Sequence, residues 1–407
     1  MWNFPEVVVE EFVLLNLSTP VSREVADRPD RRQSTKLAKY LRDTWARNPV
    51  VVANFGGIDV FDKTIEKIDA LDDCFQSARG KYFHLGGSPA GASQNFAATQ
   101  LKYRVTGVRP SLPGQVAHYL DQIALSREDP YYRAALLVAA RAEVEHVSCP
   151  EYHNAYHFSD VIAATIEFLK KNNALATQDI PGAIKLSRQE LVVGIMAAAG
   201  HDVGHPGGKN SLPGEATAPD PFRLERQSFS IIEPLLQAAR IPHESIARVK
   251  VAILTTSRDP RGPGKLLKEI DGPLAEDPAL RVISQNLICA DVAQSCMFGL
   301  RSNEIATQAL EAEWQNRGYS DQLMGDTKAE DGSVIPDGRT IQARKAFLDF
   351  VAYGEGGPDA AGAHAAVGEN YSDLYADTKA KLESVRIQER SHAVVSICFD
   401  PVTSRFS

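Results

Sequence analysis

Helical periodicity dominates the sequence from Gln115 onward. Apolar residues recur there every three or four positions, in segments such as AALLVAARAEVEHV, SDVIAATIEFLKK and RVISQNLICADVAQSCMFGL. This is the pattern of amphipathic helices that pack on a shared core. Patterns typical of strands are almost absent, and Pro- and Gly-rich segments such as HPGGKNSLPGEATAPDP separate the helical ones. We therefore predict that residues 111–407 form one all-α domain, a compact multi-helix bundle.

Residues 1–110 lack this regularity and are predicted to form an N-terminal extension that is partly loop-rich. The charged run from Ser22 to Arg47 predicts an exposed leader with one helix, whose mixed charges indicate a solvated face rather than a nucleic-acid or membrane patch. Two short strands are expected, at Val50–Val52 and within LKYRVTGV, residues 101–108. No sensor motif is recognisable, so the sequence assigns the extension no role.

Charge and cysteine content narrow the class of protein. The chain of 407 residues has 44 basic and 52 acidic residues and a net charge of −8, which disfavours binding to nucleic acid. It has no apolar run of the length a bilayer span needs, and acids stand near the N-terminus where a secretory signal would carry Lys or Arg. Five cysteines without CxxC spacing indicate reduced thiols. We expect a cytoplasmic protein without stable membrane insertion; a homodimer is left open.

Two histidine pairs at i, i+4 spacing carry the strongest chemical signal. Each pair has an aspartate nearby, and the two groups are His153, His157 and Asp160, and His201, Asp202 and His205. On a helix this spacing places both imidazoles on one face. The preceding segment LVVGIMAAAG, residues 191–200, is apolar all the way round and predicts a buried helix that carries His201 and Asp202 into the interior.

A bound metal explains buried imidazoles beside buried carboxylates. A buried carboxylate costs several kcal/mol unless it is paired or coordinates a cation, and a mixture of His and Asp suits zinc or a harder divalent ion. The alternative is that each histidine is hydrogen-bonded in the core and each aspartate caps a helix. The presence of two pairs, one of them within HDVGHPG, favours the metal site.

The two motifs also resemble a known family. YHNAYHFSDV (152–161) and HDVGHPGGKN (201–210) are similar to the signature motifs of the class I cyclic-nucleotide phosphodiesterases, a branch of the HD superfamily of metal-dependent phosphohydrolases. Weaker similarities extend the resemblance over about residues 115–355; they lie in SIIEPLL (230–236), ADVAQ (290–294) and FLDFV (347–351). The resemblance implies an all-α fold of the HD/phosphodiesterase type and hydrolysis of a 3′,5′-cyclic nucleotide, cAMP or cGMP or both, to the 5′-monophosphate.

The resemblance also assigns roles to individual residues. It implies a tightly held Zn²⁺ with four ligands, which are His157, His201, Asp202 and Asp291. Asp202 would bridge to a second metal, Mg²⁺ or Mn²⁺, and a hydroxide between the two ions would attack the phosphate. His153 would be the general acid for the leaving 3′ oxygen. Three further residues would support these groups, namely Asp160, His205 and Glu233.

The substrate pocket departs from the family. The resemblance implies substrate contacts from Tyr152 and from the helix that carries Phe347, the expected clamp for the purine ring. Where the family has a glutamine three residues before that phenylalanine, this chain has Arg344, which cannot accept a hydrogen bond from a base. Gln342 lies two residues earlier, about 200° further round the helix. Recognition of the base is therefore expected to differ from that of the family.

Two other functions stay open at this point. An HD phosphohydrolase that acts on another phosphorylated nucleotide or signalling molecule is favoured by Arg344, because a guanidinium suits phosphate better than a purine edge. A catalytically dead regulator is disfavoured, because every expected ligand and His153 are present.

Overall fold

The structure is a computed structural model of all 407 residues. It describes most of residues 32–318, with gaps at 83–98, 145–150, 179–182, 258–267, 297–304 and a few positions besides. Beyond residue 318 it describes four two-residue strands.

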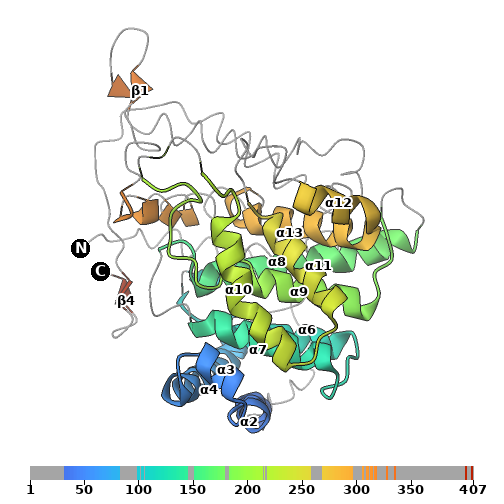
Figure 1. Ribbon diagram of the computed structural model, residues 1–407. Helices are drawn as coiled ribbons and strands as arrows, with labels where there is room; N and C mark the ends of the chain where they lie inside the picture. Colours follow the sequence, from blue (N-terminus) through green and yellow to red (C-terminus); the bar gives the residue numbers. More distant parts are fainter. Residues whose placement is uncertain are drawn as a thin grey trace, which may run out of the picture.

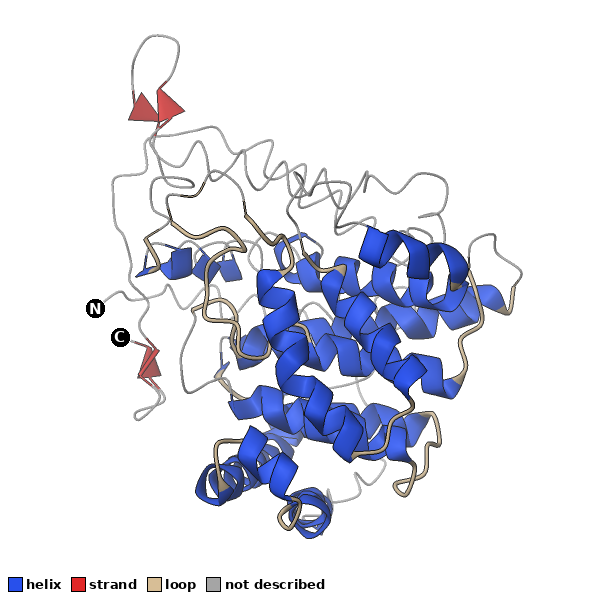
Figure 2. Cartoon of the chain, viewed as in Figure 1, coloured by secondary structure: helices blue, strands red, loops and turns tan. Residues whose placement is uncertain are grey.

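The described part of the chain is helical, which confirms the predicted all-α class. The helices are α2 (Arg32–Trp45), α3 (Pro49–Asn54), α4 (Ile58–Tyr82), α6 (Leu112–Gln122), α7 (Pro130–Val144), α8 (Ala155–Ala176), α9 (Arg188–Gly200), α10 (Arg223–Ala238), α11 (His243–Leu254), α12 (Lys268–Glu276) and α13 (Pro278–Cys296). The strands are β1 (Thr327–Lys328) and β2 (Val334–Ile335), which pair antiparallel, and β3 (Phe399–Asp400) and β4 (Arg405–Phe406), which do the same. Figure 2 shows the helices grouped into one bundle.

Helix α9 runs through the centre of this bundle, in contact with α7, α8, α11 and α13 (Figure 1). Every residue from Leu191 to Gly200 is buried, as the sequence predicts. The helix begins at a capping box, in which Ser187 and Glu190 each satisfy a backbone N–H of the other. Gly194 lets α8 approach closely, since a Cβ there would lie 2.7 Å from a methyl carbon of Leu169. His201 and Asp202, which follow α9, are thereby fixed in the interior.

The N-terminal helices pack on the same core. Buried residues of α2, α3 and α4 belong to one hydrophobic cluster with those of α7 and α10; they include Leu41, Trp45, Val51, Phe61 and Ile65. Figure 1 shows these three helices side by side, with α4 in contact with α7 and α3 in contact with α10.

The predictions of two strands in this region are both wrong. Val50–Val52 lies in α3 and Lys102–Arg104 is helical. For α3 the reason is local, because the Asn48 side chain accepts hydrogen bonds from the N–H groups of Val50 and Val51, and Pro49 occupies the first turn. This cap and the fixed backbone angle of proline favour a helix and outweigh the preference of valine for strands.

A buried ion cluster joins α4 and α7 to the segment before α6. Glu143 of α7 accepts hydrogen bonds from both terminal nitrogens of Arg109, at 2.6 and 3.1 Å, and from the N–H of Leu112 at 2.9 Å. The Nζ atom of Lys67 lies 3.2 Å from the same carboxylate. Burial raises the pKa of Glu143, but Arg109 and Lys67 outweigh it and lower that pKa to about 2. The carboxylate therefore stays ionised near neutral pH.

Glu143→Ala is expected to lower the free energy of unfolding by about 3 to 5 kcal/mol, because it leaves the buried Arg109 charge without its partner. Urea unfolding measures this difference. Glu167→Ala is the control, since it removes a half-exposed glutamate paired with Lys170, and should change stability by no more than about 0.5 kcal/mol. Equal effects of the two substitutions would contradict this view of the cluster.

Among the described residues, no helix combines the length and the apolar character needed to cross a bilayer.

Candidate metal centre

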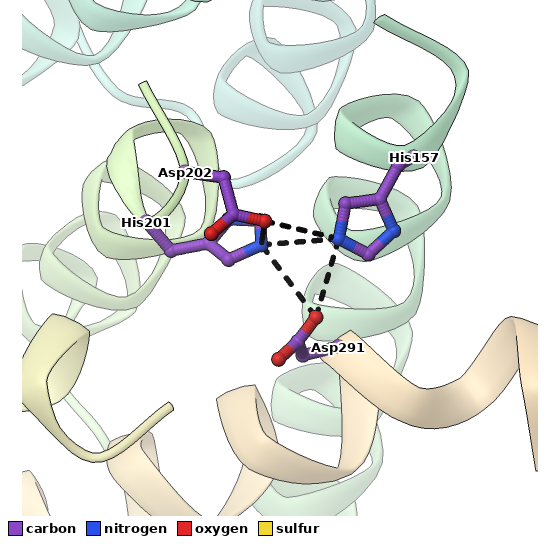
Figure 3. A group of neighbouring side chains, drawn as sticks. All are labelled: His157, His201, Asp202 and Asp291. Atoms are coloured by element: carbon purple, nitrogen blue, oxygen red, sulfur yellow. Dashed lines mark hydrogen bonds and ion pairs between the residues drawn. The ribbon is translucent and has the colours of Figure 1, made fainter. Parts of the chain in front are cut away.

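Four side chains from three segments converge at the C-terminal end of α9. His157 lies in the first turn of α8, which Asn154 caps by accepting backbone N–H groups of that turn. His201 and Asp202 directly follow α9, and Asp291 lies on α13. One potential ligand atom of each of the four lies within 4.8 Å of those of the other three (Figure 3). The structure thus brings together all four predicted ligands.

The converging atoms are of the types that bind metals. The Nε2 atoms of His157 and His201 are 3.3 Å apart. Oδ2 of Asp202 lies 2.9 Å from Nε2 of His201 and 3.3 Å from Nε2 of His157. Oδ1 of Asp291 lies 3.2 and 3.6 Å from the Nε2 atoms of His157 and His201, respectively. Both imidazoles are buried, and the carboxylates are only slightly exposed, at 12% and 11% of their side-chain area.

The hydrogen bond of His201 tests whether this arrangement fits a cation. Its Nδ1 lies 2.9 Å from the carbonyl oxygen of Ala198, which can only accept, so Nδ1 carries a proton. In the neutral ring Nε2 then presents a lone pair to the centre, where it faces carboxylate oxygens and the second imidazole. Such a set of lone pairs repels itself unless a positive charge lies between them. Two imidazoles and two carboxylates therefore fit a divalent cation.

The pKa shifts of the site residues also indicate that the two carboxylates require a positive charge. Burial lowers the pKa of His201, but the carboxylates of Asp202 and Asp291 outweigh it and raise that pKa well above 6.5. Burial raises the pKa of Asp202, yet His201 and His153 hold it well below 3.8. Without a metal, a proton on His201 supplies positive charge beside the two carboxylates.

His153 is held beside the cluster by Glu313, a residue that the sequence reasoning missed. The Glu313 carboxylate accepts hydrogen bonds from Nδ1 of His153 at 2.7 Å and from the backbone N–H groups of Tyr152, His153 and Gly208 at 3.0 to 3.1 Å. Nε2 of His153 then faces Asp202, at 3.8 Å from Oδ2. Burial lowers the pKa of His153, but Glu313 and Asp202 outweigh it and raise that pKa above 6.5.

His205 stacks on His153. The two rings are 3.8 Å apart and 19° from parallel, and Nδ1 of His205 accepts the N–H of Gly207 at 3.0 Å. Burial and the charge of His153 lower the pKa of His205 to about 3, so this ring stays neutral. His153, His205 and Glu313 are also close enough to share a cation. Because four donors already occupy the Glu313 carboxylate, the geometry favours an orienting role for it instead.

Glu233, a predicted supporting residue, has a hydrogen-bond partner on its own helix. Its carboxylate accepts a hydrogen bond from Gln237, one turn further along α10. A second glutamate of α10, Glu225, is buried, accepts hydrogen bonds from Nδ2 of Asn210 at 3.0 and 3.3 Å, and interacts electrostatically with Asp202 and Asp291. The two glutamates are eight positions apart, on the order of 12 Å along a helix.

Asp160 lies outside the cluster. It is buried and accepts two hydrogen bonds from Arg104, at 2.6 and 2.9 Å. Among the described residues nothing bonds Nδ1 of His157, so Asp160 acts on His157 through its charge alone.

Of the four predicted substrate residues, the structure describes only Tyr152. Tyr152 is buried, and its ring centre lies 4.6 Å from that of His157 and 4.9 Å from that of His153, so it forms part of the wall around the histidines. Gln342, Arg344 and Phe347 lie outside the described residues, and their contacts with substrate remain predictions.

Glu225→Gln should stabilise the metal-free protein increasingly as pH rises. Burial above all raises the pKa of Glu225 from 4.5 to about 7, so ionisation of this group costs folding free energy between pH 4.5 and 7, and the cost is constant above that range. At about 1.4 kcal/mol for each pH unit, the advantage of the variant should grow by about 2 kcal/mol from pH 5.5 to 8.5.

Urea unfolding at the two pH values measures this. Glu233→Gln on the same helix is the matched control, and its stability difference should change by less than about 0.5 kcal/mol. A constant difference for Glu225→Gln would mean that this carboxylate is not buried as the structure shows.

Comparison with known proteins agrees with the motifs. Residues 152–219 match the family model of the 3′5′-cyclic nucleotide phosphodiesterases. Among solved structures, the Leishmania protein LmjPDEB1 in complex with IBMX matches with a TM-score of 0.45 and 15% identity, over 77% of this chain and 91% of that one. No curated protein matches significantly. The resemblance predicted from the two histidine motifs is thus confirmed: residues 152–219, which contain both motifs, are similar to the 3′5′-cyclic nucleotide phosphodiesterase family.

Proposed function

We propose that this protein is a metal-dependent phosphodiesterase that hydrolyses a 3′,5′-cyclic nucleotide to the 5′-monophosphate. The observation that carries the proposal is the convergence of the His157, His201, Asp202 and Asp291 ligand atoms in a buried site, with the imidazole of His153 directed at the same point. The family match of residues 152–219 supports it.

His157, His201, Asp202 and Asp291 would hold a Zn²⁺ ion, and Asp202 would share a second ion, Mg²⁺ or Mn²⁺. When bound, these ions would activate a water molecule and neutralise the phosphate oxygens. Glu225 and Asn210 lie beside the ligands, where a buried carboxylate can accept hydrogen bonds from ordered water.

His153 would supply the proton for the leaving group. Hydrolysis adds a water oxygen to phosphorus and breaks the bond from phosphorus to the 3′ oxygen, which must take up a proton. Nε2 of His153 faces the cluster, whereas Nδ1 is bonded to Glu313. The raised pKa of His153 keeps that proton available near neutral pH. The ring of His205, which stacks on that of His153, would limit rotation of the His153 side chain.

The remaining assignments extend this proposal. We place the catalytic domain at residues 111–407, although α2 to α4 share its core. A cytoplasmic location agrees with the exposed Cys74, which forms no disulfide among the described residues. The substrate is a small molecule, and light scattering would distinguish a monomer from a homodimer.

Initial rates on a panel of substrates test the proposal. The metal-loaded protein is expected to cleave cAMP and cGMP, and not linear nucleotide monoesters or triphosphates. Turnover of linear phosphates alone would indicate another HD phosphohydrolase, and a folded, metal-loaded protein that turns over nothing would indicate a regulator; either result overturns the proposal.

Discrimination between the two cyclic nucleotides is expected to be weak, because Arg344 cannot accept a hydrogen bond from a base. Arg344→Gln should then sharpen the preference for one purine. Phe347→Ala should raise KM for both substrates alike, by about 5- to 150-fold, if the ring stacks on the base. A strong preference in the parent that is lost only in Gln342→Ala would show that Gln342 faces the base instead.

A further inference from the structure

The helices before residue 110 contact α10, and α10 in turn contacts the segment that carries Asp202. Helix α3 packs on α10, and the Asn54 side chain at its end donates a hydrogen bond from Nδ2 to the carbonyl oxygen of Ile231 at 2.7 Å. The backbone carbonyl of Asn54 in turn accepts a hydrogen bond from Nε of Arg141 in α7, at 3.2 Å. Asn54 is therefore fixed between two helices of the catalytic bundle.

The turn of α10 that Asn54 contacts is interrupted by a proline. Pro234 has no N–H to donate to the carbonyl of Ser230, and its ring crowds that carbonyl. The neighbouring carbonyl, that of Ile231, is the one that receives the Asn54 amide. Asn54 thus secures α10 at the point where the helix lacks one of its own hydrogen bonds.

The same turn of α10 holds Gly204, which lies between Asp202 and His205. Gly204 has a positive φ of 76°, and a Cβ at this position would clash with Cδ1 of Ile231. Gln227, one turn before Ile231, donates a hydrogen bond from Nε2 to the Gly204 carbonyl at 2.7 Å. The side chains of Gln227 and Ile231 on α10 therefore fix the segment that carries Asp202.

We propose that Asn54 is a positioning residue of the metal centre: by holding α10 at Ile231, it keeps Gly204, and with it Asp202 and His205, in the geometry that retains metal. The inference rests on the metal site of the proposed function. It gives the N-terminal helices a role, which is to complete the support of a site to which they contribute no ligand.

The carboxamide of Asn54 can be replaced by a group of the same size that cannot donate this hydrogen bond. Only the amino group of Asn54 can face the Ile231 carbonyl, because its own oxygen would meet another acceptor there. Asn54→Asp keeps the size of the side chain but places a carboxylate against that carbonyl. Tyr40→Phe is the matched control, since Tyr40 of α2 also donates to a backbone carbonyl of the bundle, that of Arg127 at 2.7 Å, away from α10.

The experiment follows zinc release from the full-length, zinc-loaded proteins into a chromogenic chelator. Asn54→Asp is expected to release zinc at least about 10-fold faster than the parent, the range found when groups behind metal ligands are changed. Tyr40→Phe should stay within about twofold. Urea unfolding of both variants at the same pH shows whether a loss of global stability accompanies the change.

A second variant tests the route through Ile231. Ile231→Ala should also speed zinc release, and the double variant with Asn54→Asp should be no faster than the faster single one, because both act through Gly204. Equal release from Asn54→Asp and Tyr40→Phe, or independent effects in the double variant, would overturn the inference. Since the readout is metal retention, a protein that holds zinc but cleaves no cyclic nucleotide would refute only the proposed function.

Discussion

Asp202→Ala is expected to abolish turnover and to lower zinc affinity by more than about 100-fold. Oδ2 of Asp202 lies close to both imidazoles, at 2.9 Å from Nε2 of His201 and 3.3 Å from Nε2 of His157. It is also the one carboxylate that we assign to both ions. Since changes behind a ligand already cost about 10- to 100-fold in affinity, loss of the ligand itself should cost more. Elemental analysis after gel filtration, together with initial rates, measures both effects.

Asp62→Ala is the control for this experiment, because it removes a half-exposed aspartate that pairs with Arg42 on the N-terminal helices. It should leave metal content and rate unchanged. If Asp202→Ala kept the metal content and the turnover of the parent, the ligand assignment would be wrong.

His153→Asn should lower kcat by about 10² to 10⁴, the range typical of general acid catalysis, and should leave metal content nearly unchanged. The reason is that Nδ1 of His153 is committed to Glu313, whereas Nε2 lies 3.8 Å from Asp202, beside the cluster rather than in it. Rates and metal content are measured on the same preparations.

A substitution of Glu313 tests how this residue supports His153 as the general acid. Glu313→Gln keeps the shape of the carboxyl group but removes the charge that raises the pKa of His153. The upper limit of the pH range in which the enzyme is active should therefore shift to lower pH. If His153→Asn lost metal in proportion to activity, His153 would be a ligand and not the acid.

The features predicted correctly from the sequence are those that depend on patterns of neighbouring residues. The buried α9 follows from ten apolar residues without a polar face, and the choice of His157, His201 and Asp202 as candidate ligands follows from the two motifs, at the start of α8 and the end of α9. Such features are encoded within about ten residues. In α3 the local cap and proline decided the structure, and an expectation based on valine content was wrong.

Glu313 and Glu225 were missed for a different reason. Glu313 is 160 positions from His153, and its role arises only when the fold brings four donors to its carboxylate. Glu313 stands in no motif of the sequence, so no local signal points to it. For α10, the dipeptide Leu224-Glu225 resembles Ile232-Glu233, and periodicity alone does not show which end of the helix faces the metal.

Hydrolysis of cAMP and cGMP in ¹⁸O-labelled water by the reconstituted protein tests the central claim most directly. The protein is stripped with a chelator, reloaded with Zn²⁺ and Mg²⁺, and its product is analysed by mass spectrometry. The account predicts a 5′-monophosphate with one ¹⁸O on phosphorus, formed only after reloading. A folded protein with its full metal content that leaves both cyclic nucleotides intact, or that yields a 3′-monophosphate, would contradict it.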